Sequence, residues 1–186
     1  MSRISLVEPD LANDEIREMF RRMEKLGFTL LNVFKLWANN PKAASGFLLI
    51  AEALYAEPKL LPRHRELAYL RASQVNDCHY WIPTHMMLGR SVGLTENELR
   101  SMGDTKMCDT FSDTDLCVIE YSEQLTMNNI VSDEMYARLD KHFSQEQIVE
   151  LSMTVGLSAM VNRVHATFKT EVDTDTKSYL ASEGLA

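Results

Sequence analysis

Apolar residues along the chain recur three and four positions apart, which is the spacing of one face of an α-helix. The segment 14–26 carries this pattern at Ile16, Met19, Phe20 and Met23. The segment 41–56 repeats it with a broader apolar face. Alternating apolar and polar positions, which would predict β-strands, are nearly absent. The pattern therefore predicts an all-α protein.

Capping residues and helix breakers define the expected ends of these helices. Asn40-Pro41 and Pro62 are typical of helix starts, and Thr95–Glu98 and Ser144–Gln147 have the pattern of capping boxes. We predict a compact bundle of seven or eight helices. Their expected ranges are residues 14–26, 41–56, 63–75, 78–92, a short stretch after Thr95, 114–127, 133–142 and 145–170. Residues 1–172 are expected to form a single domain, and residues 173–186 a loosely held C-terminal tail.

One proline is placed differently from those that open helices. Pro83 falls in the middle of the predicted helix 78–92. Because proline has no backbone N–H to donate, we expect it to bend this helix or to unwind it locally.

Composition narrows the classes of protein and of partner. The chain has 186 residues with 19 Lys+Arg and 27 Asp+Glu, a net charge of −8 and a pI near 5.1. This acidity argues against a nucleic-acid partner, because such binding depends on Lys and Arg that neutralise phosphates. No apolar run approaches the roughly 20 residues of a membrane span, and residues 1–13 lack an apolar run of the signal-peptide type. We expect a cytoplasmic protein that binds neither nucleic acid nor membrane.

The cysteines and histidines do not predict a disulfide framework or a metal site. Three cysteines are too few, and odd in number, for a framework, and Cys108 and Cys117 are expected to be buried small hydrophobic residues. The chain has no Gly-rich phosphate loop, no HExxH and no paired CxxC, and its five histidines are dispersed. No metal and no cofactor is therefore expected.

Reactive side chains concentrate between residues 63 and 85. Cys78 and His85 are seven residues apart, so they lie near one stripe of the predicted helix 78–92. In its first turn, the backbone N–H groups and the helix dipole would favour a Cys78 thiolate. If this helix packs back on the preceding one, Glu66 comes beside the stripe and completes an acid/base set. The alternatives are an ordinary ion pair between Glu66 and Arg63 or Arg71, and a core histidine at position 85.

The same residues resemble a known family. The pattern Glu66, eleven residues, Cys78-x-x-Trp81-x-x-x-His85 is similar to the Glu, eleven residues, Cys-x-x-Cys-x-x-x-His of the carboxymuconolactone decarboxylase-like family, which includes alkylhydroperoxidase D. Trp81 stands at the second cysteine. Flanking segments extend the resemblance over most of residues 30–172, among them 32–41, 93–98, 131–134, 143–151 and 161–163.

The resemblance implies an all-α bundle that assembles as a homo-oligomer, usually a trimer or hexamer, with a dimer also considered. It implies catalytic roles for Glu66, Cys78 and His85. In the peroxidase branch two cysteines form a disulfide, which Trp81 does not allow. The decarboxylase branch needs no cysteine pair, and its aromatic segment before the histidine resembles Tyr80-Trp81, so we assign these two to substrate binding. For a substrate carboxylate, Arg71 and Arg163 are the candidate cations.

Three hypotheses follow for the function. The first is a lyase or isomerase that moves protons on a small organic acid or lactone, with Glu66 and His85 as acid and base. The second is a thiol peroxidase of the one-cysteine type, in which Cys78 attacks the peroxide and an external thiol reduces the sulfenate. The third is a bundle without catalysis, whose pocket binds a ligand or supports assembly.

Overall fold

A computed structural model describes residues 2–182, and within that range every regular element is helical. The prediction of an all-α protein is confirmed. The elements are η1 (Pro9–Leu11), α1 (Asp14–Lys25), α2 (Asn32–Trp37), α3 (Pro41–Tyr55), α4 (Pro62–Val75), α5 (Trp81–Ser91), α6 (Glu96–Ser101), η2 (Thr105–Met107), α7 (Asp113–Asn128), α8 (Asp133–His142), α9 (Gln145–Phe168) and α10 (Thr174–Ser182).

Local capping interactions explain where many of these helices begin. The Asn13 and Asn40 side chains accept hydrogen bonds from the backbone N–H of Ile16 and Ala43. Pro41 and Pro62 occupy first helical positions, where a missing N–H leaves no bond unmade. Both predicted capping boxes, at Thr95 and at Ser144, are present with reciprocal hydrogen bonds.

The chain divides into two compact units. The first comprises residues 2–58 together with 165–182 of the described chain, and the second comprises residues 59–164. The single domain expected for residues 1–172 stays a prediction. The expected tail contains helix α10, and its last residues, 183–186, lie outside the described residues.

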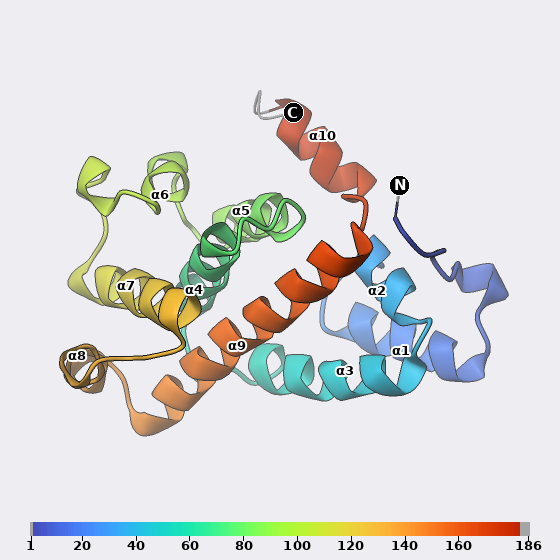
Figure 1. The fold of residues 1–186 in the computed structure, drawn as a ribbon, viewed down its shortest axis with the longest axis horizontal. Coiled ribbons are helices and arrows are strands. Elements are labelled where there is room, and N and C mark those ends of the chain that lie inside the picture. The colour runs from blue at the N-terminus through green and yellow to red at the C-terminus, as the bar shows by residue number, and fades with distance from the viewer. Residues whose placement is uncertain (1, 183–186) are drawn as a thin grey trace. The chain divides into compact units, whose positions relative to one another are not determined.

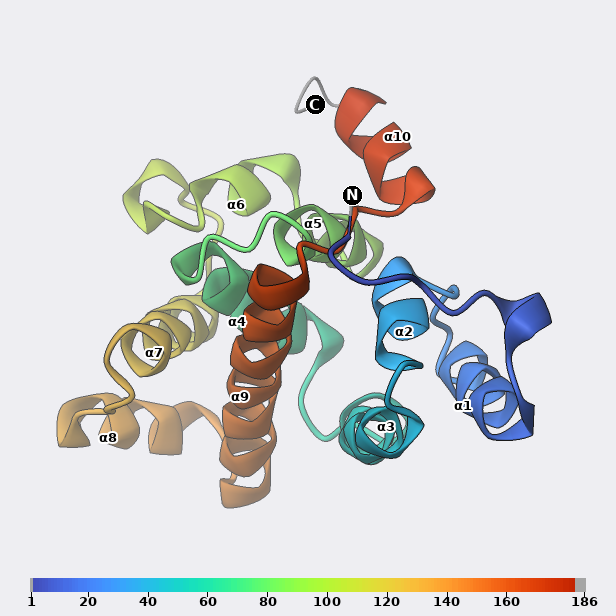
Figure 2. The ribbon, with the colours of Figure 1, turned by 45° about the vertical axis from the view of Figure 1, so that its right-hand side comes forward.

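In the first unit, α1 and α2 both pack against α3 (Figure 2). The apolar face of α1 is buried, and an ion pair between Arg22 and Glu52 at 2.7 Å joins α1 to α3. The short helix α2 was not predicted, because six residues are too few to display a helical period. Its first backbone N–H donates to the Asp173 carboxylate at 2.6 Å, which ties it to the segment before α10.

In the second unit, α4 lies between α5 and α7 (Figure 1). Nine of the 14 residues of α4 are buried, and they face every direction around the helix. A helix buried on all sides is the centre of a bundle. Polar side chains on α4 are therefore held inside the unit, and this placement creates the candidate site.

Candidate functional site

The turn between α4 and α5 reverses the chain with a Schellman motif. The N–H of Cys78 donates to the carbonyl of Ser73, and the N–H of Asp77 donates to the carbonyl of Gln74, both at 3.0 Å. Asp77 takes the left-handed conformation that this motif requires, with φ of 50°. The reversal brings α5 back against α4, as the helical-hairpin hypothesis required.

Glu66 on α4 and His85 on α5 meet inside this hairpin. The Nδ1 atom of His85 lies 2.7 Å from Oε2 of Glu66, and each side chain is only 2 % exposed. An ionised carboxylate accepts hydrogen bonds, so Nδ1 is the donor and carries the proton. In the neutral ring, Nε2 is then the nitrogen with a lone pair. The expected contact between Glu66 and His85 is present, and their roles in catalysis stay predictions.

Aromatic rings hold the imidazole in one orientation. The ring of Tyr69 stacks on His85 with 3.7 Å between centroids and 15° between planes. The Trp81 ring also lies beside His85, with 5.4 Å between the two ring centroids. Tyr80 is fully buried and packs edge-on against Trp81. A buried base that is fixed by a carboxylate and by stacked rings is preorganised for proton transfer.

The second oxygen of Glu66 faces a cation. The Nε atom of Arg65 lies 3.4 Å from Oε1 of Glu66, and Arg65 is itself buried. Arg65 and Tyr69 were both missed in the sequence analysis. Tyr69 is three residues after Glu66 and so shares its side of the helix, but the sequence alone does not set it apart from the other residues of this helix, which is buried on all sides.

The expectation that Cys78 would favour the thiolate is wrong. Its side chain is 5 % exposed, and this burial raises the pKa of the thiol. Hydrogen bonds from the backbone N–H groups of Trp81 and Tyr80 act in the opposite direction and do not outweigh the burial. The predicted stabilisation of a thiolate by the helix N-terminus is thus present, but the balance favours the neutral thiol.

Pro83 does not lie in the middle of a helix, as was expected. The regular helix α5 begins at Trp81, three residues later than predicted, so Pro83 lies in its first turn. N–H groups of a first turn have no partner within the helix, and proline is tolerated there. The predicted disruption in mid-helix is therefore wrong.

The remaining predicted residues lie in other surroundings. The Nη2 atom of Arg71 is 2.6 Å from Oε2 of Glu123 on α7. Arg163 is exposed on α9 and donates from Nη1 to the carbonyl of Ala159. The contact with Glu66 comes instead from Arg65. Cys108 and Cys117 are buried, as predicted, and all three cysteines are free thiols.

Within residues 2–182, no three His, Cys, Asp or Glu side chains gather in a way that suits a metal ion. None of the helices in that range combines the length and apolar character needed to traverse a bilayer.

Comparison with known proteins gives a family and a relative. The carboxymuconolactone decarboxylase family matches residues 41–106, which include Glu66, Cys78 and His85. The uncharacterised protein YdfG of Bacillus subtilis (strain 168) is 32 % identical over 102 residues, which is 54 % of this chain and 69 % of that protein.

Solved structures share the fold. A peroxidase-related protein of Ralstonia eutropha JMP134, described as an alkylhydroperoxidase AhpD core, superposes with a TM-score of 0.81 at 19 % identity and covers 94 % of each chain. A variant of the debrominase Bmp8 in complex with 2,3,4-tribromopyrrole has a TM-score of 0.82 at 15 % identity, over 98 % of this chain and 99 % of that one. A peroxidase-related protein of Silicibacter sp. TM1040 has a TM-score of 0.79 at 19 % identity, over 94 % and 93 %. At these identities the likeness establishes the fold alone.

Proposed function

Because the chain belongs to the carboxymuconolactone decarboxylase family, we propose that it catalyses proton transfer on a small organic acid or lactone without a cofactor, as a decarboxylase or an isomerase. The proposal rests on the buried contact between Oε2 of Glu66 and Nδ1 of His85, which are 2.7 Å apart. A carboxylate that holds one imidazole nitrogen leaves the other one oriented as a base.

Both reactions need a group that moves one proton to or from a substrate carbon, and we assign that role to Nε2 of His85. In isomerisation, Nε2 of His85 takes a proton from a carbon next to a carbonyl, and the electron pair moves into that carbonyl. The proton then returns to a different carbon. In decarboxylation, the ring first carries a proton taken from water on Nε2. The bond to the carboxylate carbon breaks, its electron pair stays on the remaining carbon, CO₂ leaves, and Nε2 gives its proton to that carbon. Glu66 stabilises the positive charge that the ring carries between the two transfers.

A substrate carboxylate needs a cation near the pair, and Arg65 is the candidate that the site supports best. Its Nε lies 3.4 Å from Oε1 of Glu66, which makes it the arginine in direct contact with the pair. Arg71 forms an ion pair with Glu123, and Arg163 is exposed on α9. Both stay candidates for this role, with less support than Arg65. Since both members of the pair are 2 % exposed, turnover requires side-chain movement that admits the substrate.

A substrate screen tests the proposal. The protein is incubated in D₂O with a panel of small lactones and unsaturated carboxylic acids, and NMR follows exchange of C–H for C–D, isomerisation and loss of CO₂. We expect the wild-type protein to turn over at least one compound and the Cys78→Ser variant to keep much of that activity. Absence of any exchange or turnover across the panel would favour the third hypothesis, a bundle that binds or assembles without catalysis.

A second candidate function is a one-cysteine thiol peroxidase, and one observation favours it. The sulfur of Cys78 faces the backbone N–H groups of Trp81 and Tyr80, which stabilise a thiolate once it forms. The thiolate would attack the peroxide O–O bond, release the alcohol and become a sulfenate. An external thiol would then return it to the thiol, with water as the second product.

Thiol labelling separates the two candidates. Because all three cysteines are buried and burial raises the pKa of Cys78 and of Cys117, we expect Ellman's reagent to react slowly with the native protein at pH 7. Denaturation should release three thiols per chain. Rapid labelling of one native thiol, absent from Cys78→Ser and accompanied by hydroperoxide consumption with an added thiol, would establish the peroxidase instead.

A further inference from the structure

Helix α9 carries large apolar side chains that are exposed to solvent. Val149 is 62 % exposed, Met153 45 % and Met160 43 %. They lie four and seven residues apart, so they follow one another along one side of the helix. Exposed apolar residues scattered singly are ordinary, but a continuous line of them on one helix is typical of an interface.

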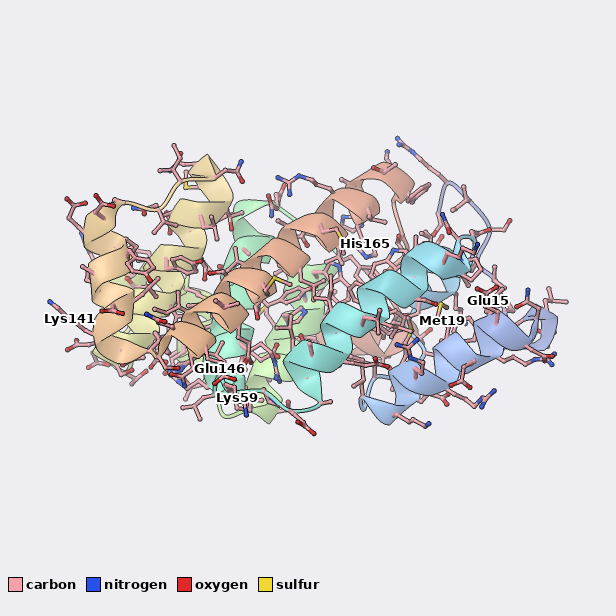
Figure 3. All side chains as sticks on the ribbon, turned by 90° about the horizontal axis from the view of Figure 1, so that it is seen from below. Glu15, Met19, Lys59, Lys141, Glu146 and His165 are labelled. Atoms are coloured by element: carbon pink, nitrogen blue, oxygen red, sulfur yellow. The ribbon has the colours of Figure 1, made fainter. Side chains whose placement is uncertain are left out.

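Three further residues complete this line, which we call the α9 stripe. Gly156 lies between the two methionines, and a Cβ atom built on it meets nothing within 4 Å. Glu146 is exposed at the start of the helix (Figure 3), and Arg163 is exposed near its other end. Because successive residues turn by about 100°, the six positions share an arc of about 100° on the helix surface. The stripe consists of Glu146, Val149, Met153, Gly156, Met160 and Arg163, all in the second unit.

The order of residues in the stripe is symmetric about its centre. Counting outward from the midpoint between residues 154 and 155, Met153 matches Gly156, Val149 matches Met160, and Glu146 matches Arg163. A large residue is thus matched with glycine, an apolar residue with an apolar one, and an acid with a base. A surface that complements itself when reversed is suited to a two-fold contact between identical chains.

From this self-complementarity we propose that the α9 stripe is the contact surface for a second copy of this chain, with the two α9 helices antiparallel about a two-fold axis. Met153 then packs into the space over Gly156 of the second copy, and the two ends each pair Glu146 with Arg163. A parallel arrangement is unfavourable, because it sets Glu146 against Glu146 and Arg163 against Arg163. Charge therefore selects the antiparallel register.

The surface beside the α9 stripe is compatible with this antiparallel contact. A hollow between α8 and α9 is lined by Tyr136, Gln145, Ile148, Val149, Ser152 and Met153. Val149 and Met153 belong to the stripe, so the hollow is continuous with it. Met160 of the second copy lies opposite Val149, where a flexible methionine side chain fills an irregular gap.

Site-specific cross-linking tests the register. Two variants, Val149→Cys and Met160→Cys, are mixed, oxidised and run on a non-reducing gel. In the proposed contact, residue 149 lies level with residue 160 of the other copy, whereas two residues 149 are separated by 11 positions, or about 16 Å. A disulfide needs Cα atoms within about 7 Å. We expect a cross-linked dimer from the mixture and none from either variant alone.

A matched control uses a cysteine outside the stripe. Met127 is 62 % exposed on α7, so Met127→Cys mixed with Val149→Cys should give no dimer. The three native cysteines are buried, and wild-type protein should give none either. Cross-linking of Val149→Cys with itself would indicate a parallel contact and overturn the proposal, as would a mixture that never cross-links.

Charge reversal tests the ends of the stripe, where Glu146 and Arg163 are both exposed, and circular dichroism verifies that each variant is folded. In sedimentation equilibrium, Glu146→Arg and Arg163→Glu should each weaken dimerisation at least about tenfold, because each places like charges together at both ends. The double variant Glu146→Arg/Arg163→Glu restores opposite charges and should return the dissociation constant to near the wild-type value. A wild-type protein that stays monomeric at several hundred micromolar, or a double variant weaker than either single one, would contradict the proposal.

Discussion

Replacing His85 with alanine is expected to lower kcat by about 10²–10⁴-fold on any substrate that the screen identifies, because general acid/base catalysis contributes on that scale. The side chain is the one base in the site that a carboxylate orients at 2.7 Å and that an aromatic ring stacks at 3.7 Å. Steady-state kinetics with purified variants measure the effect. Circular dichroism and thermal melting verify that the variant is folded.

Glu66→Gln tests the same pair without leaving a cavity where the side chain was. The amide is close in size to the carboxylate, but it carries no charge and can donate to Nδ1, which favours the tautomer with the proton on Nε2. We expect a loss of kcat comparable with that of His85→Ala. Cys78→Ser, which keeps the size of the turn residue, is the matched control and should retain most activity. A loss confined to the Cys78 variant would refute the acid/base assignment and point to the peroxidase.

Features that depend on neighbours in the sequence were predictable. The helix starts at Asn13, Pro41 and Pro62 follow from capping chemistry, which involves only the next few residues. The meeting of Glu66 with His85 followed from a single further assumption, that two consecutive helices joined by a tight turn pack side by side. The spacing of those residues also identified the family, with Trp81 as its one departure from the pattern.

Features that depend on distant contacts were not predictable. The pKa of Cys78 is raised because helices around it exclude water, and no local pattern reports that burial. Arg65 and Tyr69 escaped notice because α4 is buried all round, so its sequence shows no single apolar face against which a polar residue stands out. Arg71 is bound by Glu123, 52 residues away.

The second large effect concerns stability, and it arises from a buried ion cluster in the second unit. Arg63 at the start of α4 hydrogen-bonds Glu98 on α6 and Asp115 on α7, the latter with Nε to Oδ1 at 3.0 Å. The Glu98 and Asp115 side chains are each 4 % exposed. The cluster thus joins three helices through one guanidinium. Removing it leaves two buried carboxylates, and the nearest other basic group is the His64 imidazole, 3.7 Å from Asp115, whose own pKa is lowered by burial.

Arg63→Gln is therefore expected to lower the free energy of unfolding by about 3–5 kcal/mol, the usual penalty for breaking a buried ion pair on one side. Arg71→Gln is the matched control on the same helix. Its partner Glu123 is 40 % exposed and returns to water when the arginine is removed, so we expect a loss of about 1 kcal/mol or less. Urea unfolding at pH 7 measures both. Equal losses in the two variants would show that the cluster contributes no more than a surface pair.

The pH dependence of this difference gives the decisive check. Burial acts to raise the pKa of Asp115 and of Glu98, but hydrogen bonds from Arg63, from Ser112 to Asp115 and from Thr95 to Glu98 lower them further, so both lie below their ordinary values of 3.8 and 4.5. A carboxyl with a lowered pKa binds fewer protons when folded than when unfolded, so its contribution is complete above its ordinary pKa and is lost as the pH falls toward the folded value. The stability advantage of the wild type over Arg63→Gln should hold from pH 7 to about pH 5 and shrink below about pH 4.5, where protonation removes the charge that Arg63 compensates. An advantage that persists unchanged at pH 3 would mean that Arg63 stabilises the unit by packing alone.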